Sequence, residues 1–101
     1  MQRLTVQYFS PADPDAFDKG YQERHVPLVR AVPGLKRFTL THPQALGGDA
    51  PYLVAELYFE DADALKASLT SPEMGAAAQD AATYDVASTV MFSGEVTEID
   101  L

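Results

Sequence analysis

The chain has 101 residues, 47% of them hydrophobic, which is enough for one small domain, so we expect a single domain over residues 1–101. Its net charge of -8 argues against nucleic acids and anionic membranes as partners, because both attract basic surfaces. The absence of cysteine excludes disulfide bonds and thiolate chemistry.

The N-terminal residues pass directly into an alternating pattern, without an apolar signal segment. No apolar run approaches the length that spans a membrane. We therefore expect a cytoplasmic protein.

Residues Arg3–Phe9 alternate between apolar and mixed positions, with Leu4, Val6 and Tyr8 on one face. This alternation predicts a half-buried strand. A turn at Ser10–Ala12 then leads the chain into a helix.

Residues Asp13–Val32 predict one long amphipathic helix. Asp13 is placed to cap the helix, and Pro14 follows at a position that needs no amide donor. Pro27 lacks an amide and its ring crowds the preceding turn, so we expect a kink or an early stop near Val26. The apolar face recurs at spacings of three and four residues: Phe17, Tyr21, His25, Leu28, Val29 and Val32.

The middle of the chain predicts a hairpin of two strands. Residues Leu35–His42 alternate, and Tyr52–Phe59 has the strongest strand composition in the chain. The glycine-containing segment Pro43–Pro51 between them predicts a loop. One apolar face of the second strand is unbroken: Leu53, Ala55, Leu57 and Phe59.

The last third predicts a helical region and a final strand. Asp61 is a plausible cap for a helix through about Leu69, with Leu65 and Leu69 pointing inward. Ser71 and Pro72 restart a helical segment that is rich in alanine. Residues 85–98 then predict a strand rich in valine and threonine.

This order of elements, βαββαβ, predicts an α+β fold of the ferredoxin-like class. Right-handed crossovers place both helical regions on one face of a four-stranded antiparallel sheet. The other face mixes aromatic and polar residues, which is typical of a protein interface. We expect this face, with Thr89 and Met91 included, to pack against a second copy as a dimeric α+β barrel, although a solvated sheet face is the alternative.

Two polar side chains, Tyr21 and His25, lie on the apolar helix face where aliphatic residues are usual. A histidine there can donate or accept a proton in a pocket, because its ordinary pKa lies near neutral pH. The alternative is a core histidine bonded to a backbone carbonyl. Tyr21 either shares the pocket as a phenolic donor or packs as a core aromatic residue.

Four further side chains are candidates for ligand binding. Tyr8, Phe38 and Tyr84 line a cleft between helices and sheet if that cleft is open, and otherwise fill the core. His42 stands at the end of a strand beside the loop, as an exposed rim residue or at the pocket mouth. With two distant histidines and no cysteine, no metal site is predicted.

Glu56 is a carboxylate in the middle of a predicted strand. We expect it to pair with Arg37 across the strands, on the same face of the sheet. The alternative is a base with a raised pKa inside the dimer.

Tyr8-Phe9, Phe17, Tyr21 and the run His25-Val26-Pro27-Leu28-Val29 together resemble the EthD family, a member of the dimeric α+β barrel group. The resemblance extends along nearly the whole chain through the order of elements. It implies a homodimer with a cleft in each subunit, at which Tyr21 and His25 take the matching positions. It also implies a small hydrophobic or aromatic ligand and neither metal nor bound organic cofactor, with haem ligation by His25 as an alternative.

Two functional hypotheses follow from this resemblance. The first is a cofactor-independent enzyme that enolises, cyclises, dehydrates or oxygenates a carbonyl or phenolic compound. In it His25 would transfer the proton, and Tyr21 or Tyr8 would hold the oxygen. The second is a non-catalytic dimeric protein that binds such a ligand, or assists a degradation or biosynthesis pathway. The sequence leaves both hypotheses open.

Overall fold

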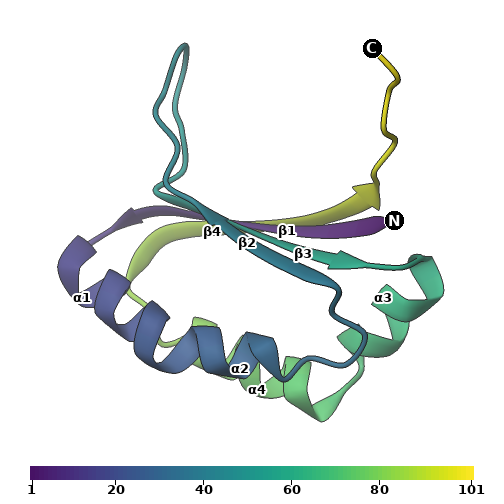
Figure 1. Cartoon of the computed structure of the whole chain (residues 1–101). Helices are drawn as coiled ribbons and strands as arrows, with labels where there is room; N and C mark the ends of the chain where they lie inside the picture. The colour runs from purple at the N-terminus through teal and green to yellow at the C-terminus, as the bar shows by residue number, and fades with distance from the viewer.

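One antiparallel sheet forms a layer of the protein, and all helices cover the same face of it (Figure 1). The computed structural model describes all residues 1–101. Its elements are, in chain order, β1 (Gln2–Pro11), α1 (Pro14–Gly20), the π-helical turn η1 (Tyr21–His25), α2 (Val26–Arg30), β2 (Arg37–Thr41), β3 (Leu53–Phe59), α3 (Ala62–Leu69), α4 (Pro72–Ala81) and β4 (Val86–Glu95).

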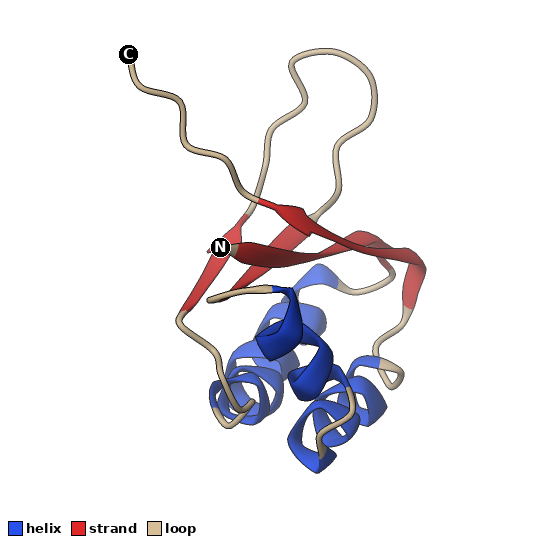
Figure 2. Ribbon diagram, turned by 90° about the vertical axis from the view of Figure 1, so that its right-hand side faces the viewer, coloured by secondary structure: helices blue, strands red, loops and turns tan.

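The strands lie in the order β2-β3-β1-β4, and every neighbouring pair is antiparallel. This arrangement confirms the predicted ferredoxin-like α+β fold, and Figure 2 shows the sheet edge-on above the helices. No helix is both long and apolar enough to cross a lipid bilayer.

The predicted caps all form. The Asp13 carboxylate accepts a hydrogen bond from the amide of Ala16 at 3.1 Å, and that of Asp61 accepts one from Ala64 at 2.8 Å. The Ser71 hydroxyl accepts one from Met74 at 3.1 Å, just before Pro72 begins α4. Each cap satisfies an amide that the first helical turn leaves free.

The expected early stop at Pro27 is wrong, because helical structure continues to Arg30. The chain instead changes to a wider helical turn over Tyr21–His25, and the amide of Val26 donates to the carbonyl of Tyr21 five residues earlier. This register change comes directly before the proline that cannot donate a hydrogen bond of its own. The first helical region is therefore continuous, with a π turn at its centre.

The core lies between the sheet and the helices. Leu53, Ala55, Leu57 and Phe59 are all buried, as their alternation predicts. The last three share one core cluster with Val29, Val32 and Leu65, whereas Leu53 lies in a second cluster with Tyr8, Phe17 and Tyr21. Leu69 is 45% exposed, so its predicted inward position is wrong. Ser68 is buried in its place and donates to the carbonyl of Leu65 at 2.8 Å.

Strand β4 corrects the expected outer face of the sheet. Met91 pairs with Val6 and Thr89 with Tyr8, so both side chains lie on the helix-covered face. Val90 and Phe92 take the outer positions instead. Neither face of β4 is fully covered, so its sequence lacks the alternation that would have set its register.

Glu56 pairs with a cation, but not with the predicted one. Its carboxylate lies 3.2 Å from the Arg3 guanidinium on the neighbouring strand. The Arg37 guanidinium lies over the ring of Tyr58 instead, 5.2 Å from its centroid. Since β3 lies between β1 and β2, Glu56 has a neighbour on either side and the sequence did not show which one it meets.

Candidate functional site

A cavity of about 320 Å³ lies between the sheet and the helices. Twelve of its fourteen lining residues are hydrophobic, and several are alanines of α4 that leave room beneath the strands. The lining comprises Leu4, Val6, Tyr8, Tyr21, His25, Val29, Ala55, Leu57, Met74, Ala77, Ala78, Ala81, Thr89 and Met91. A largely apolar cavity with few polar groups is the usual form of a small-molecule site.

Three candidate residues from the sequence meet at this cavity: Tyr8, Tyr21 and His25. The ring centroids of Tyr21 and His25 are 4.7 Å apart, and those of Tyr8 and Tyr21 are 5.7 Å apart. All three residues are at least 95% buried. The structure thus brings an imidazole and two phenols together at the wall of an apolar cavity.

The π turn η1 carries two of these residues, since it begins at Tyr21 and ends at His25. Both are buried, while Gln22, Glu23 and Arg24 between them are exposed. The turn therefore places both polar side chains on the inner face of one helical region. Short π segments of this kind are frequent at functional sites.

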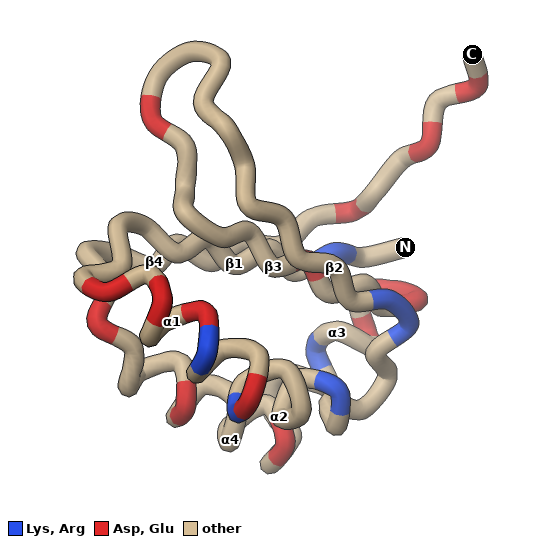
Figure 3. Tube along the Cα trace, turned by 60° about the vertical axis from the view of Figure 1, so that its left-hand side comes forward, with Lys and Arg blue, Asp and Glu red and all other residues tan.

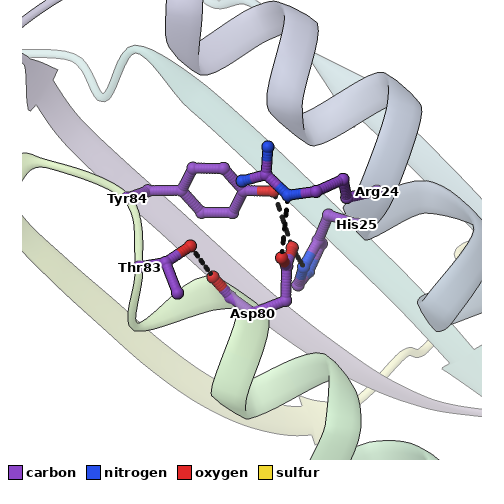
Figure 4. Close-up of polar contacts among 5 residues, drawn as sticks. All are labelled: Arg24, His25, Asp80, Thr83 and Tyr84. Atoms are coloured by element: carbon purple, nitrogen blue, oxygen red, sulfur yellow. Dashed lines mark hydrogen bonds and ion pairs between the residues drawn. The ribbon is translucent and has the colours of Figure 1, made fainter.

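Asp80 of α4 fixes the His25 ring (Figure 4). Its Oδ2 lies 3.1 Å from His25 Nδ1 and accepts a hydrogen bond from the Tyr84 hydroxyl at 2.6 Å. Its Oδ1 accepts one from Arg24 Nε at 3.2 Å. A carboxylate can only accept, so His25 Nδ1 carries the proton and Nε2 is left without a partner in the chain.

Burial and hydrogen bonding shift the pKa values of both His25 and Asp80. Burial lowers the pKa of His25 below its usual value, although the hydrogen bond to Asp80 partly opposes this. Burial alone would raise the pKa of Asp80, but hydrogen bonds from Tyr84, Arg24 and His25 lower it overall. At neutral pH the site therefore holds a neutral imidazole, with a basic Nε2, beside an ionised carboxylate.

The two phenols at the cavity remain protonated. Burial raises the pKa of Tyr8 to about 12, with the Tyr21 hydroxyl lowering it and Asp80 raising it slightly. Burial also raises the pKa of Tyr21, and the neighbouring Tyr8 and Tyr84 hydroxyls add to this. The hydrogen bond between them lowers the pKa of Tyr8 and raises that of Tyr21, so Tyr21 is its donor and the Tyr8 proton is the one left for a ligand oxygen.

The other three candidates lie elsewhere. Tyr84 packs behind His25, with ring centroids 6.1 Å apart, and holds Asp80 rather than lining the cavity. Phe38 packs against both clusters of buried residues in the core and is not among the residues that line the cavity. His42 is exposed at the base of the loop, where its Nδ1 lies 3.1 Å from the Tyr52 carbonyl.

Sequence reasoning missed Asp80, which comes from a helix 55 residues beyond His25. One signal was present in the sequence. Asp80 falls in the last turn of α4, where the helix dipole disfavours a carboxylate. An acid at that position calls for donors from outside the helix, and Arg24, His25 and Tyr84 supply them.

No group of three or more histidine, cysteine, aspartate or glutamate side chains is placed to hold a metal ion. The lining residues that carry polar groups are His25, Tyr8, Tyr21 and Thr89. This set suits hydrogen bonding and proton transfer.

Comparison with known proteins gives consistent matches. Residues 10–85 match the EthD domain. An uncharacterized 11.0 kDa protein from the thcB-thcC intergenic region of Rhodococcus erythropolis is 41% identical over 100 residues, which cover 96% of this chain and 97% of that protein.

Solved structures share the fold. An EthD family protein from Bacillus halodurans is 30% identical with a TM-score of 0.85, and the match covers 96% of this chain and 99% of that one. A dimeric ferredoxin-like protein of unknown function from Thermobifida fusca is 18% identical with a TM-score of 0.73, covering 94% of this chain and 90% of that one.

Proposed function

The chain belongs to the EthD family, and we propose that it binds a small hydrophobic or aromatic compound through a carbonyl or phenolic oxygen, with His25 as proton shuttle. One observation carries this proposal. Asp80 holds Nδ1 of His25, so the free Nε2 is the atom left to meet a ligand at the cavity wall. A histidine buried only for stability has no need of an unpartnered nitrogen beside an apolar cavity.

The cavity supports the ligand class. Its volume of about 320 Å³ suits a compound of one or two rings, and its lining offers mainly apolar contacts. The small side chains of Ala77, Ala78 and Ala81 line the cavity on the α4 side, which leaves room for a ring. The hydrogen-bonded phenols of Tyr8 and Tyr21 supply one free donor for a ligand oxygen.

The chemistry that this geometry supports best is enolisation. Nε2 of His25 takes a proton from the carbon next to a carbonyl, and the carbonyl oxygen becomes an enolate that accepts a hydrogen bond from Tyr8. The ionised Asp80 stabilises the imidazolium that forms. The imidazolium then returns the proton to the same or another carbon, so no oxidant or reductant is consumed.

The same proposal includes a homodimer that forms through the outer face of the sheet. Similar solved proteins are described as dimeric. The outer positions include Val90 and Phe92, which are 43% and 45% exposed. A domain of this size buries only part of its apolar surface alone, so association would cover these side chains.

Two probes test the proposal. Binding of 2-naphthol, a fluorescent phenol, is measured by fluorescence titration, and the exchange of the α-protons of 1-tetralone for deuterium is followed by proton NMR. We expect binding and accelerated exchange with the wild type and with His42→Gln, the matched control at the exposed histidine. His25→Gln should lose the exchange.

Each outcome has a clear consequence. Binding of 2-naphthol without accelerated exchange would support the non-catalytic ligand-binding hypothesis and contradict proton transfer by His25. The proposed function is wrong if neither 2-naphthol nor 1-tetralone binds in the cavity and His25→Gln leaves both measurements unchanged.

A further inference from the structure

Two segments project from the sheet on the side opposite the helices (Figures 1 and 2). One is the loop between β2 and β3, here named the loop arm (residues 43–51), and the other is the C-terminal tail arm (residues 96–101). Both carry apolar side chains that are largely exposed. Leu46 of the loop arm is 102% exposed, and Ile99 and Leu101 of the tail arm are 71% and 120% exposed.

Beyond the amide of Val96, which donates to the Met1 carbonyl at 2.8 Å, no backbone hydrogen bond of the chain holds either arm. None of the backbone hydrogen bonds made outside helices and strands involves residues 43–51 or 97–101. A Cβ added at Gly47 or Gly48 would meet no atom within 4 Å. Ordering a backbone costs about 1–2 kcal/mol per residue, so an extended arm needs contacts from another molecule.

The sheet face between the arms suits a second copy of this acidic chain. Figure 3 shows acidic residues along the helices and on both arms. The outer positions of the strands carry only Arg3, Arg37 and Glu56 as charged residues. Two copies can therefore meet at this face without the repulsion that their net charge of -8 creates elsewhere.

The arms also complement that face in charge and shape. Asp49 of the loop arm and Glu98 and Asp100 of the tail arm are acidic, whereas the face has an excess of arginine. A hollow of about 620 Å³ lies at the base of the loop arm, lined by Phe9, His42 and Tyr52 among others. This hollow offers a neighbouring molecule a binding site between the loop arm and the sheet.

The reach of the arms decides how they would meet a partner. An extended chain spans about 3.3 Å per residue, so the loop arm can rise up to about 17 Å from the end of β2 to Leu46. The tail arm can rise about 20 Å. Two sheets packed face to face lie about 10 Å apart, so both arms are long enough to pass the partner's sheet.

We infer that the two arms clasp a second copy of this chain. They run along the edges of the partner's sheet, and Leu46, Ile99 and Leu101 pack against those edges. This inference rests on the sheet-to-sheet homodimer of the proposed function, and it adds the arms as the part of the interface that contributes affinity.

The test compares dimer dissociation constants by sedimentation equilibrium. The variant Leu46→Ser/Ile99→Ser should dissociate at least about tenfold more readily than the wild type, because burying one such side chain is worth that much in affinity. Leu69→Ser is the matched control, since Leu69 is 45% exposed on α3, on the helix side. It should leave the dissociation constant unchanged.

A second measurement uses the absence of native cysteine. The single-cysteine variants Leu46→Cys and Leu69→Cys react with a maleimide at protein concentrations below and above the dissociation constant. Reaction at position 46 should slow several-fold in the dimer, and reaction at position 69 should not.

Failure of the inference differs from failure of the proposed function. The clasp would be overturned, and the sheet-face dimer kept, if two results came together. The double variant would have the dissociation constant of the wild type, and the maleimide reaction at position 46 would be equally fast in monomer and dimer. A wild type that is monomeric at all concentrations would overturn the clasp and the proposed dimer. Binding of 2-naphthol in the cavity is measured separately and does not depend on either result.

Discussion

Removing the Asp80 carboxylate should destabilise the protein and release the His25 ring. In Asp80→Ala, the Nδ1 proton of the buried His25 and the hydroxyl of Tyr84 both lose their acceptor. A hydrogen bond to a charged group contributes about 1.5–3 kcal/mol, and the two bonds share one carboxylate and do not add fully. We therefore expect a loss of about 3 kcal/mol in the free energy of unfolding.

This loss is large for a domain of 101 residues. A change of 1 kcal/mol shifts Tm by about 4–8 °C at this size, so Tm should fall by roughly 12–24 °C. Urea unfolding followed by circular dichroism measures the free energy directly. Asp80→Asn should lose less, because its amide oxygen still accepts one hydrogen bond.

The control is Arg24→Gln, which removes the exposed partner of the same carboxylate and its contact with the Tyr84 ring, and should cost at most about 1 kcal/mol. Nitrogen NMR of the imidazole provides a second readout. It should show the Nδ1-protonated form of His25 in the wild type and a shift towards the Nε2-protonated form in Asp80→Ala. A loss below about 1 kcal/mol together with an unchanged tautomer would refute the role given to Asp80.

Three further predictions concern the same structure. Because burial lowers the pKa of His25 in the folded state, the unfolded chain binds the proton more readily below about pH 6.5, and stability falls as pH decreases through this range. The drop in unfolding free energy from pH 7 to pH 5 should therefore be smaller for His25→Gln than for the wild type. Ala81→Phe should fill part of the cavity and abolish 2-naphthol binding, whereas Ala76→Phe, on the exposed side of α4, should not. Thr5→Val should raise the unfolding free energy of the monomer by about 1 kcal/mol in urea titrations, because the Thr5 hydroxyl is buried without a partner. Equal binding by both alanine variants, or a destabilised Thr5→Val, would count against the packing described.

Local patterns were sufficient to predict the fold. Alternation identified β1 and β3, and the cap residues Asp13, Asp61 and Ser71 marked the starts of three helices correctly. Each of these features depends on residues a few positions apart, so the sequence displays them directly. The order of elements then left one common topology.

The site could be predicted only in part. Tyr21 and His25 stood out because they interrupt an apolar helix face, and they do reach the cavity. Asp80 contacts His25 from a helix 55 residues further along the chain, and the residue pattern of that helix does not indicate the contact. The face of the sheet on which Met91 lies depends on the register of β4. Because β4 is exposed on both faces, its sequence does not alternate and so does not indicate that register.

The most direct test of the account is the protonation of His25 in the presence of a ligand. Protein labelled with nitrogen-15 in its histidines is titrated with 2-naphthol at neutral pH, and the two ring nitrogens are followed separately. The account predicts a neutral ring protonated on Nδ1, whose Nε2 signal shifts as ligand binds while the signals of His42 stay in place. A proton on Nε2, or an Nε2 signal that ignores a bound ligand, would contradict it.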